Sequence, residues 1–261
     1  MFDSFCRSSY RTFSLVSLLV VLAVPAGAQQ LFWVHREAAM PSKVAEYEKT
    51  NKEFIDMVKA NRDVMPKFNF EAWMSPDFVY TMVTPIGESL GGGDVFLKEF
   101  ADVAAKTPPN VADVWHRNGS TISWWSDIIY VLRSDLSYGP PTQRLQPEEG
   151  KFAQMDFYYL QPGFAPDAEA VAAEMKALYE KKKIPNPYIV LQAVTGEGPV
   201  YIVRTLAKDP ADYWVNRQKD LEMLGPEGTA LFSRVFAFTR KFESLQFFRR
   251  PDLSLAPPAK N

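Results

Sequence analysis

Cysteine is almost absent from this chain, which excludes two kinds of chemistry. The only cysteine, Cys6, lies in an N-terminal segment that we expect to be removed. The mature chain then has neither an internal disulfide nor a cysteine nucleophile. Its stability must come from side-chain packing, for which an apolar share of 47% is sufficient.

Motifs that mark common enzyme classes are missing as well. The sequence has no H-E-x-x-H, no acidic metal cluster and no G-x-S-x-G element, which argues against zinc proteases and α/β hydrolases. The run Gly91–Gly93 lacks the lysine and serine that end a phosphate-binding P-loop, so we expect a flexible loop there. The sequence therefore predicts no metal and no organic cofactor.

Long runs of basic residues are also lacking. The 31 acidic and 29 basic residues nearly balance, which disfavours a nucleic-acid partner. The densest basic cluster, Lys181–Lys183, closes a predicted helix. Cations at that position offset the exposed carbonyl dipoles of the last turn, so the cluster needs no ligand to explain it.

The longest apolar run lies near the N-terminus. Two arginines precede an apolar run of about 12 residues at 13–24, and the small residues Ala26 and Ala28 follow it in an A-x-A arrangement. A membrane-spanning helix needs about 20 apolar residues. We therefore expect residues 1–28 to be a signal peptide, and the mature protein to be periplasmic or secreted without membrane attachment.

The remainder of the chain repeats itself in the same order. The offset between matched segments falls from 125 to 121 to 117, as expected when elements keep their order while loops change length. The matched pairs are residues 133–141 (RSDLSYGPP) with 250–258 (RPDLSLAPP), 79–84 with 200–205, Phe32 with Phe157, and Pro41 with Pro166.

Hydrophobic periodicity and turn residues predict the order strand, helix, strand, strand, helices, strand in each half. Breaks at Thr107-Pro108 and Gly225-Pro226 split the second helix of each half, and Ile122–Trp125 fits either a helix or a strand. The predicted strands are 31–37, 68–74, 78–84, 128–133, 156–160, 188–194, 200–206 and 244–250, and the main helices are 42–61, 94–115, 167–182 and 209–236. We place the repeats at 29–145 and 152–256, with a linker at 146–151 and a tail at 257–261.

This element order is ferredoxin-like, with helices on only one face of a four-stranded antiparallel sheet. The order, the duplication and the split second helix resemble the dimeric α+β-barrel superfamily, particularly tandem members related to NIPSNAP and antibiotic-biosynthesis-monooxygenase domains. The resemblance implies an α+β fold in which two tandem repeats pack sheet against sheet as an intrachain pseudo-dimer, in a monomer or a homo-oligomer. The superfamily includes cofactor-free oxygenases and haem enzymes.

The chain has two histidines, so a histidine base or haem ligand must be one of them. His35 lies on the first predicted strand, where we align Leu160 of the second half, and a polar residue at that place suggests a pocket in the first half. A surface or hydrogen-bonded core histidine is the alternative. His116 follows Trp115 on a predicted helix. That position resembles the proximal histidine of haem-binding relatives but lacks their longer signature, and we expect no haem.

Aromatic residues make up 14% of the chain. Packing under the helices explains most of them, but the superfamily places its ligands between sheet and helices, where such side chains also bind small molecules. The candidate ligand-binding residues are His35, Trp73, Tyr80, His116 and Trp124.

These observations lead to one functional hypothesis and two alternatives. We expect the protein to bind a small apolar or aromatic molecule between sheet and helices. The alternatives are a cofactor-free monooxygenase-like or haem-binding enzyme, and a non-catalytic structural or assembly protein. A cavity lined by His35 and aromatic side chains favours the first hypothesis, whereas filled cores in both halves favour a structural role.

Overall fold

A computed structural model of the chain describes residues 29–65, 68–106 and 110–257. The predicted signal peptide (1–28), the predicted break at Thr107-Pro108 and the end of the predicted tail (258–261) lie outside the described residues. Within the described ranges, no helix is long and apolar enough to cross a membrane.

The elements follow the predicted order in both halves. The first half contains β1 (Leu31–Ala39), α1 (Val44–Ala60), β2 (Glu71–Met74), β3 (Val79–Gly87), α2 (Gly91–Lys106), α3 (Asn110–Gly119) and β4 (Ile122–Leu132). The second half contains β5 (Phe152–Leu160), α4 (Ala165–Lys182), β6 (Ile189–Ala193), β7 (Val200–Ala207), α5 (Pro210–Phe238) and β8 (Thr239–Arg249). The segment between the halves includes a short 3₁₀ turn, Pro147–Glu149.

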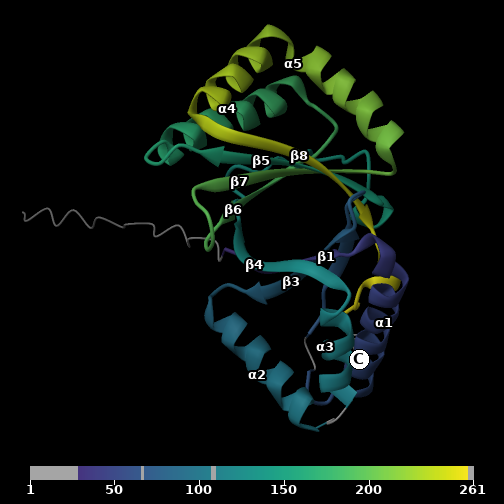
Figure 1. Ribbon diagram of the computed structural model, residues 1–261. Helices are drawn as coiled ribbons and strands as arrows, with labels where there is room; N and C mark the ends of the chain where they lie inside the picture. Colours follow the sequence, from purple (N-terminus) through teal and green to yellow (C-terminus); the bar gives the residue numbers. More distant parts are fainter. Residues whose placement is uncertain (1–28, 66–67, 107–109, 258–261) are drawn as a thin grey trace, which may run out of the picture.

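The strands close into one antiparallel barrel in the order β1-β3-β2-β8-β5-β7-β6-β4. Each half contributes four neighbouring strands, and the halves meet at two seams. At one seam β2 pairs with β8 through Trp73 and Arg249, and at the other β4 pairs with β6 through Tyr130 and Ala193. Among the described strands, closure leaves no unpaired edge on either four-stranded sheet. The helices lie on the two outer sides, with α4 and α5 over β5, β7 and β8 and with α1, α2 and α3 on the opposite side (Figure 1).

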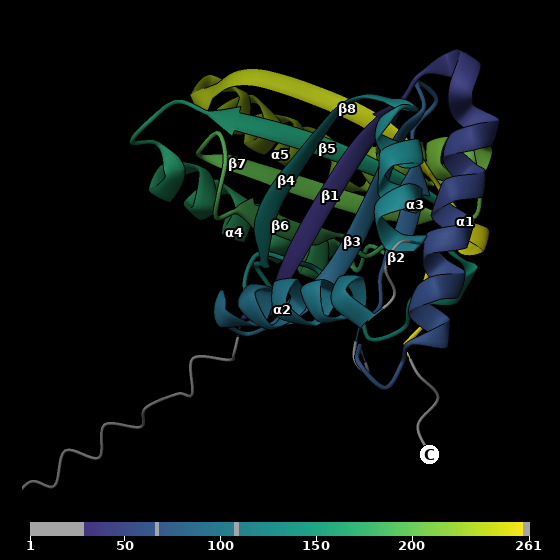
Figure 2. The same ribbon diagram turned by 60° about the horizontal axis from the view of Figure 1, so that its bottom comes forward.

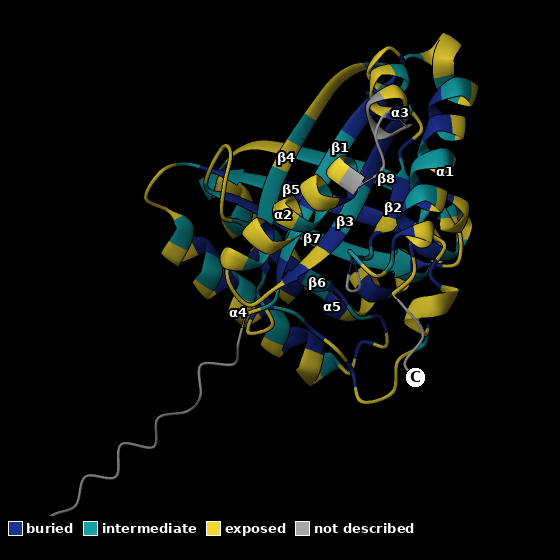
Figure 3. Cartoon of the chain, turned by 90° about the horizontal axis from the view of Figure 1, so that it is seen from below, coloured by how far each residue is buried: buried dark blue, intermediate teal, exposed yellow. Residues whose placement is uncertain are grey.

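Alternation along the strands separates the two faces of the barrel wall, because successive side chains of a strand point to opposite faces. One apolar cluster, to which both halves contribute, includes Val34, Trp73, Met155 and Phe247 and fills the barrel. Two more clusters lie between the outer faces and the helices, one in each half. Figure 2 shows β4, β1 and β3 side by side, with α2 and α3 on their outer side. Buried residues follow the strands, whereas exposed residues gather on the outward faces of the helices (Figure 3).

The structure corrects several sequence-based boundaries. Ile122–Trp125 belongs to strand β4, because the whole segment 122–132 pairs with β1 or β6. The predicted loop at Gly91–Gly93 is instead the first turn of α2, and Asp94 lies inside that turn. A Cβ on Gly92 would lie 1.7 Å from the carbonyl oxygen of Ile86. The glycine is therefore needed for the close approach of this turn to β3 rather than for loop flexibility.

The predicted break at Gly225-Pro226 is present inside α5. Gly225 has φ 58° and ψ −152°, outside the helical region, and Pro226 follows it. Glycine tolerates a positive φ at little cost, and the proline cannot donate to the preceding turn. α5 therefore consists of two helical pieces joined at this kink.

Strand register also corrects the alignment of the two halves. Ala38 pairs with Val79 as Tyr159 pairs with Val200, so the offset across β1 and β3 is 121 rather than 125. By this register the counterpart of His35 is Asp156, not Leu160. The later offset of 117 arises between the third and fourth strands of each half, because 43 positions separate Val79 from Ile122 and 39 separate Val200 from Thr239. The register shifts after Ala38 and after Tyr159 are equivalent and leave the offset unchanged.

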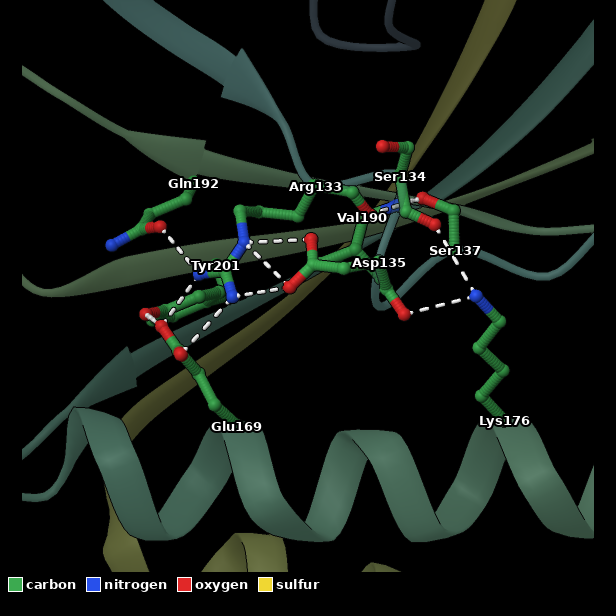
Figure 4. A network of polar contacts seen from close by, with 9 residues as sticks. All are labelled: Arg133, Ser134, Asp135, Ser137, Glu169, Lys176, Val190, Gln192 and Tyr201. Carbon is green, nitrogen blue, oxygen red and sulfur yellow. Dashed lines mark hydrogen bonds and ion pairs between the residues drawn. The ribbon is translucent and has the colours of Figure 1, made fainter. Parts of the chain in front are cut away.

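The repeated R-x-D-L-S segment links each half to the other. Arg133, just beyond β4, donates to Glu169 on α4 at 2.6 Å and to Gln192 on β6 at 2.8 Å, and Tyr201 donates to the same Glu169 (Figure 4). Asp135 binds the other side of the guanidinium at 2.7 Å. A charged group from the first half is thus held by the second half.

The second copy of the segment makes the reciprocal contacts. Arg250, just beyond β8, donates to Glu48 on α1 at 2.5 Å, and Tyr80 donates to Glu48 at 2.7 Å. Hydrogen bonds from Arg250 lower the pKa of Asp252 to about 2. Ser254 accepts from the backbone of Ala72 at 2.9 Å. We call these two networks the exchanged arginine clamps, and the repetition of the sequence motif follows from their equivalent roles.

Replacing Arg133 by methionine should destabilise the fold by about 2 to 4 kcal/mol, because it leaves Glu169 and Tyr201 without their cation in a partly buried site. Arg234→Met is the matched control, since Arg234 forms an exposed pair with Glu174 and exposed pairs contribute about 0 to 1 kcal/mol. Urea denaturation measures both. Equal losses in the two variants would contradict the role of the clamp.

Candidate functional site

A cavity of about 270 Å³ lies in the first half, between the outer face of the sheet and the helices α1, α2 and α3. Most of the apolar residues in its wall are aromatic, and two of the rings, Phe96 and Phe100, come from α2. The aromatic residues of the wall are Trp33, Phe54, Phe68, Phe70, Phe96, Phe100 and Trp115. Polar groups enter from the sheet side, at His35, Glu37 and Asp127.

These three polar residues form a connected triad on neighbouring strands. His35 and Asp127 are direct partners across β1 and β4, and Glu37 is two residues further along β1 on the same face. The Nδ1 atom of His35 lies 2.8 Å from Oδ1 of Asp127, and its Nε2 atom lies 3.2 Å from Oε1 of Glu37. Both ring nitrogens are therefore engaged by carboxylates.

The carboxylates decide the charge of the imidazole. Partial burial alone would lower the pKa of His35, but hydrogen bonds and charge attraction from Asp127 and Glu37 raise it to about 9. Burial likewise opposes ionisation of both carboxyls, yet their bonds to His35 keep the pKa values of Glu37 and Asp127 below the ordinary range. At neutral pH the triad is an imidazolium between two carboxylates, with a net charge of −1.

Helices α1 and α3 hold Glu37 in place. Its carboxylate accepts from the hydroxyl of Tyr47 at 2.7 Å and from the amide of Asn118 at 3.2 Å. The amide oxygen of Asn118 in turn accepts from Thr50 at 3.0 Å. Glu37 is fully engaged by these contacts and serves to orient His35.

Asp127 differs because one of its oxygens remains free. Oδ1 accepts from His35 and from the indole nitrogen of Trp33, the latter at 2.6 Å. Among the described residues, no donor lies within hydrogen-bond distance of Oδ2. The side chain is 29% exposed and lies at the rim of the cavity. The site thus offers an anionic acceptor beside an aromatic wall.

Of the five candidate residues named from the sequence, only His35 lines this cavity. Trp73 points into the barrel, where it is 1% exposed and its indole nitrogen finds no partner among the described residues. Tyr80 binds Glu48 in a clamp. His116 is exposed on α3, and Trp124 is exposed, with the guanidinium of Arg36 5.6 Å from its ring. These four residues do not meet His35.

Sequence reasoning missed the partners of His35. Glu37 follows it at a spacing of two on the same strand, and this spacing places two polar side chains on one face. Asp127 precedes the predicted strand at 128, and its pairing with His35 depends on a register that no local pattern reveals. Trp125 is 61% exposed and its ring lies 6.0 Å from that of His35, beside the triad.

Neither histidine is placed to act as an axial haem ligand. Both nitrogens of His35 are held by carboxylates, and His116 does not line the cavity. Within the described ranges no group of three histidine, cysteine, aspartate or glutamate side chains is placed to hold a metal ion.

The raised pKa of His35 predicts a pH-dependent stability. Its contribution is complete below the unfolded pKa of about 6.5 and is lost as pH rises through about 9. Between pH 6.5 and 9.5 the wild type should lose about 1 to 3 kcal/mol more than His35→Gln, a range that allows for partial solvent screening. Denaturation at both pH values measures the difference. His116→Gln is the control, and its stability should fall with pH as much as that of the wild type. If the stability of His35→Gln also fell as much as that of the wild type, the result would contradict the triad.

No known protein family matches the sequence, and no curated protein does. The fold is nevertheless shared with solved structures. A putative monooxygenase from Lactobacillus acidophilus NCFM has a TM-score of 0.52 at 6% identity, over 88% of this chain and 97% of that chain. An anthrone oxidase-like protein has a TM-score of 0.53 at 14% identity, over 85% and 91%.

An arginine-to-alanine mutant of chlorite dismutase from Candidatus Nitrospira defluvii has a TM-score of 0.51 at 11% identity, over 85% of this chain and 92% of that chain. These neighbours are dimeric α+β-barrel proteins. Since folds host many chemistries and the identities are low, the likeness establishes the fold alone. The chain has a mixed α+β fold with an antiparallel sheet, which it shares with these neighbours.

Proposed function

We propose that the first-half cavity binds a small aromatic molecule that carries a hydrogen-bond donor, such as a phenolic hydroxyl. The observation that carries this proposal is the free Oδ2 atom of Asp127 at the rim of an aromatic cavity. Apolar walls with a few fixed polar groups are typical of small-molecule sites. The cavity favours this function over a purely structural role.

The walls select for aromatic character. Trp33 and Phe96 meet edge to face at 5.5 Å, and Phe100 stacks on Trp115 at 4.7 Å. Rings prefer such offset or edge contacts, so a planar ligand would extend the existing cluster. The walls supply contact area, and Asp127 supplies orientation.

The charge of the triad selects for a donor rather than an anion. With a net charge of −1, it repels a carboxylate or phosphate and attracts a neutral hydroxyl or amine. A hydrogen bond to an ionised acceptor is stronger than one between neutral groups. A phenol would donate to Oδ2 while His35 keeps Asp127 ionised.

Cofactor-free oxygenation is the second candidate function, and the fold shared with putative monooxygenases and an anthrone oxidase-like protein supports it. Such a reaction needs a base that takes a proton from the substrate before dioxygen oxidises it. His35 is protonated below about pH 9, and Asp127 is a weak base because its pKa is lowered. An enzymatic role therefore fits alkaline conditions better than neutral ones.

We also propose that the two halves form an intrachain pseudo-dimer, in a tandem arrangement similar to that of NIPSNAP-like proteins. The two seams and the exchanged arginine clamps support it, since each half contributes equivalent groups to the other. The N-terminal pattern supports export to the periplasm or secretion.

The binding proposal predicts a difference between 1-naphthol and 1-methoxynaphthalene, which lacks the donor. Isothermal titration at pH 7 should show tighter binding of the naphthol. Asp127→Asn should weaken naphthol binding about 10-fold or more, because a hydrogen bond to a charged group contributes about 1.5 to 3 kcal/mol, and should leave the ether unchanged.

Asp113→Asn is the matched control, because Asp113 is an exposed carboxylate that pairs with Arg117 on α3. It should leave the binding of both ligands at the wild-type level. Equal affinities of the wild type for naphthol and ether, or full naphthol affinity in a folded Asp127→Asn variant, would refute the proposal.

A further inference from the structure

The second half contains its own cavity, of about 110 Å³, between the outer face of β5 and β7 and the helices α4 and α5. It lies on the opposite side of the barrel from the first cavity, as the positions of these helices show (Figure 1). Its wall is apolar and tyrosine-rich, with Leu160, Met175 and Val203 among its residues.

The polar residues at the strand positions equivalent to those of the triad differ from the residues of the triad. Asp156 occupies the place of His35, and Ser244 occupies the place of Asp127. The hydroxyl of Ser244 donates to Asp156 at 2.5 Å. Burial raises the pKa of Asp156, against the hydrogen bond from Ser244 and the charge of Arg217, which lower it. With an aspartate and a serine in place of the histidine and the aspartate, this half lacks the triad of the first.

The cation in this cavity is Arg217, from α5. Its guanidinium carbon lies 5.2 Å from the ring centroid of Phe232. Among the described residues, no carboxylate lies within ion-pair distance of Arg217, whereas Arg133, Arg144 and Arg250 are all paired. The charges of Asp156 and Asp220 attract Arg217, but neither carboxylate forms an ion pair with it. A carboxylate from outside could form that pair.

The other carboxyl group that lines the cavity, that of Glu169, is already engaged. Glu169 accepts from Arg133 at 2.6 Å and also from Tyr201. It therefore belongs to the exchanged arginine clamp and does not compensate Arg217. The remaining lining offers phenol groups, including Tyr158 and Tyr213, which can donate hydrogen bonds to an acceptor.

We propose that the second-half cavity binds a small organic monocarboxylate with a branched apolar body. The carboxylate pairs with Arg217, whose planar guanidinium suits two parallel hydrogen bonds, and the body contacts Leu160, Met175 and Val203. A dry cavity of about 150 Å³ accepts benzene, so this cavity suits a body somewhat smaller than a benzene ring. The site is independent of the phenol site proposed for the first half.

The test compares 3-methylbutanoate with its neutral analogue 3-methylbutanamide by isothermal titration of the full chain at pH 7. The acid should bind saturably and at least 10-fold more tightly than the amide. Arg217→Met should weaken binding of the acid at least 10-fold. The affinity of Arg217→Lys for the acid should lie between those of the wild type and Arg217→Met. Arg234→Met, which removes an exposed cation from α5, should leave the affinity for the acid unchanged.

Two further variants test whether the acid occupies this cavity rather than the one in the first half. Ala172→Leu fills the second-half cavity while keeping Arg217 and should also abolish binding, whereas His35→Gln should leave it unchanged. The proposal is overturned if the amide binds as tightly as the acid, if folded Arg217→Met keeps the wild-type affinity, or if the folded wild type shows no saturable binding of 3-methylbutanoate.

Discussion

The pairing of strands across the two seams is the constraint on which this structure depends. A four-stranded sheet with helices on one face has two open edges and one apolar face that water would contact. Pairing β2 with β8 and β4 with β6 removes all four edges and encloses the cluster around Trp73 and Phe247. Leaving that face in water would cost about 25 cal/mol for each Å². The exchanged arginine clamps lie just beyond β4 and β8, where they hold both seams in register.

Closure of the barrel leaves the outer faces available for binding. The interior is filled by side chains from both halves, so the cavities lie between sheet and helices, one in each half. They share a position but differ in charge, because His35 and Asp127 stand where the second half has Asp156 and Ser244. The same fold can therefore carry the proposed phenol site in one half and the proposed carboxylate site in the other, with the barrel core unchanged.

The sequence predicts the element order well, because periodicity and turn residues are local. It also indicates the R-x-D-L-S repeat, but not its role, since Arg133 and Glu169 lie on different halves and meet only after the barrel closes. His35 could be singled out because it is one of two histidines in the chain and lies on a predicted strand. Asp127 could not, because its contact depends on strand register. Trp73 faces the barrel rather than a cavity for the same reason: a shift of one residue exchanges the two faces of a strand.

The most direct test of the proposed pseudo-dimer is to express residues 29–145 and 151–261 separately and to refold them alone and together. Size-exclusion chromatography and thermal melts report the outcome. Each half alone should aggregate or self-associate, because it exposes an apolar sheet face and two strand edges, and mixing the halves during refolding should yield a soluble one-to-one complex. A monomeric isolated half that melts cooperatively near the temperature of the full chain would contradict the pseudo-dimer.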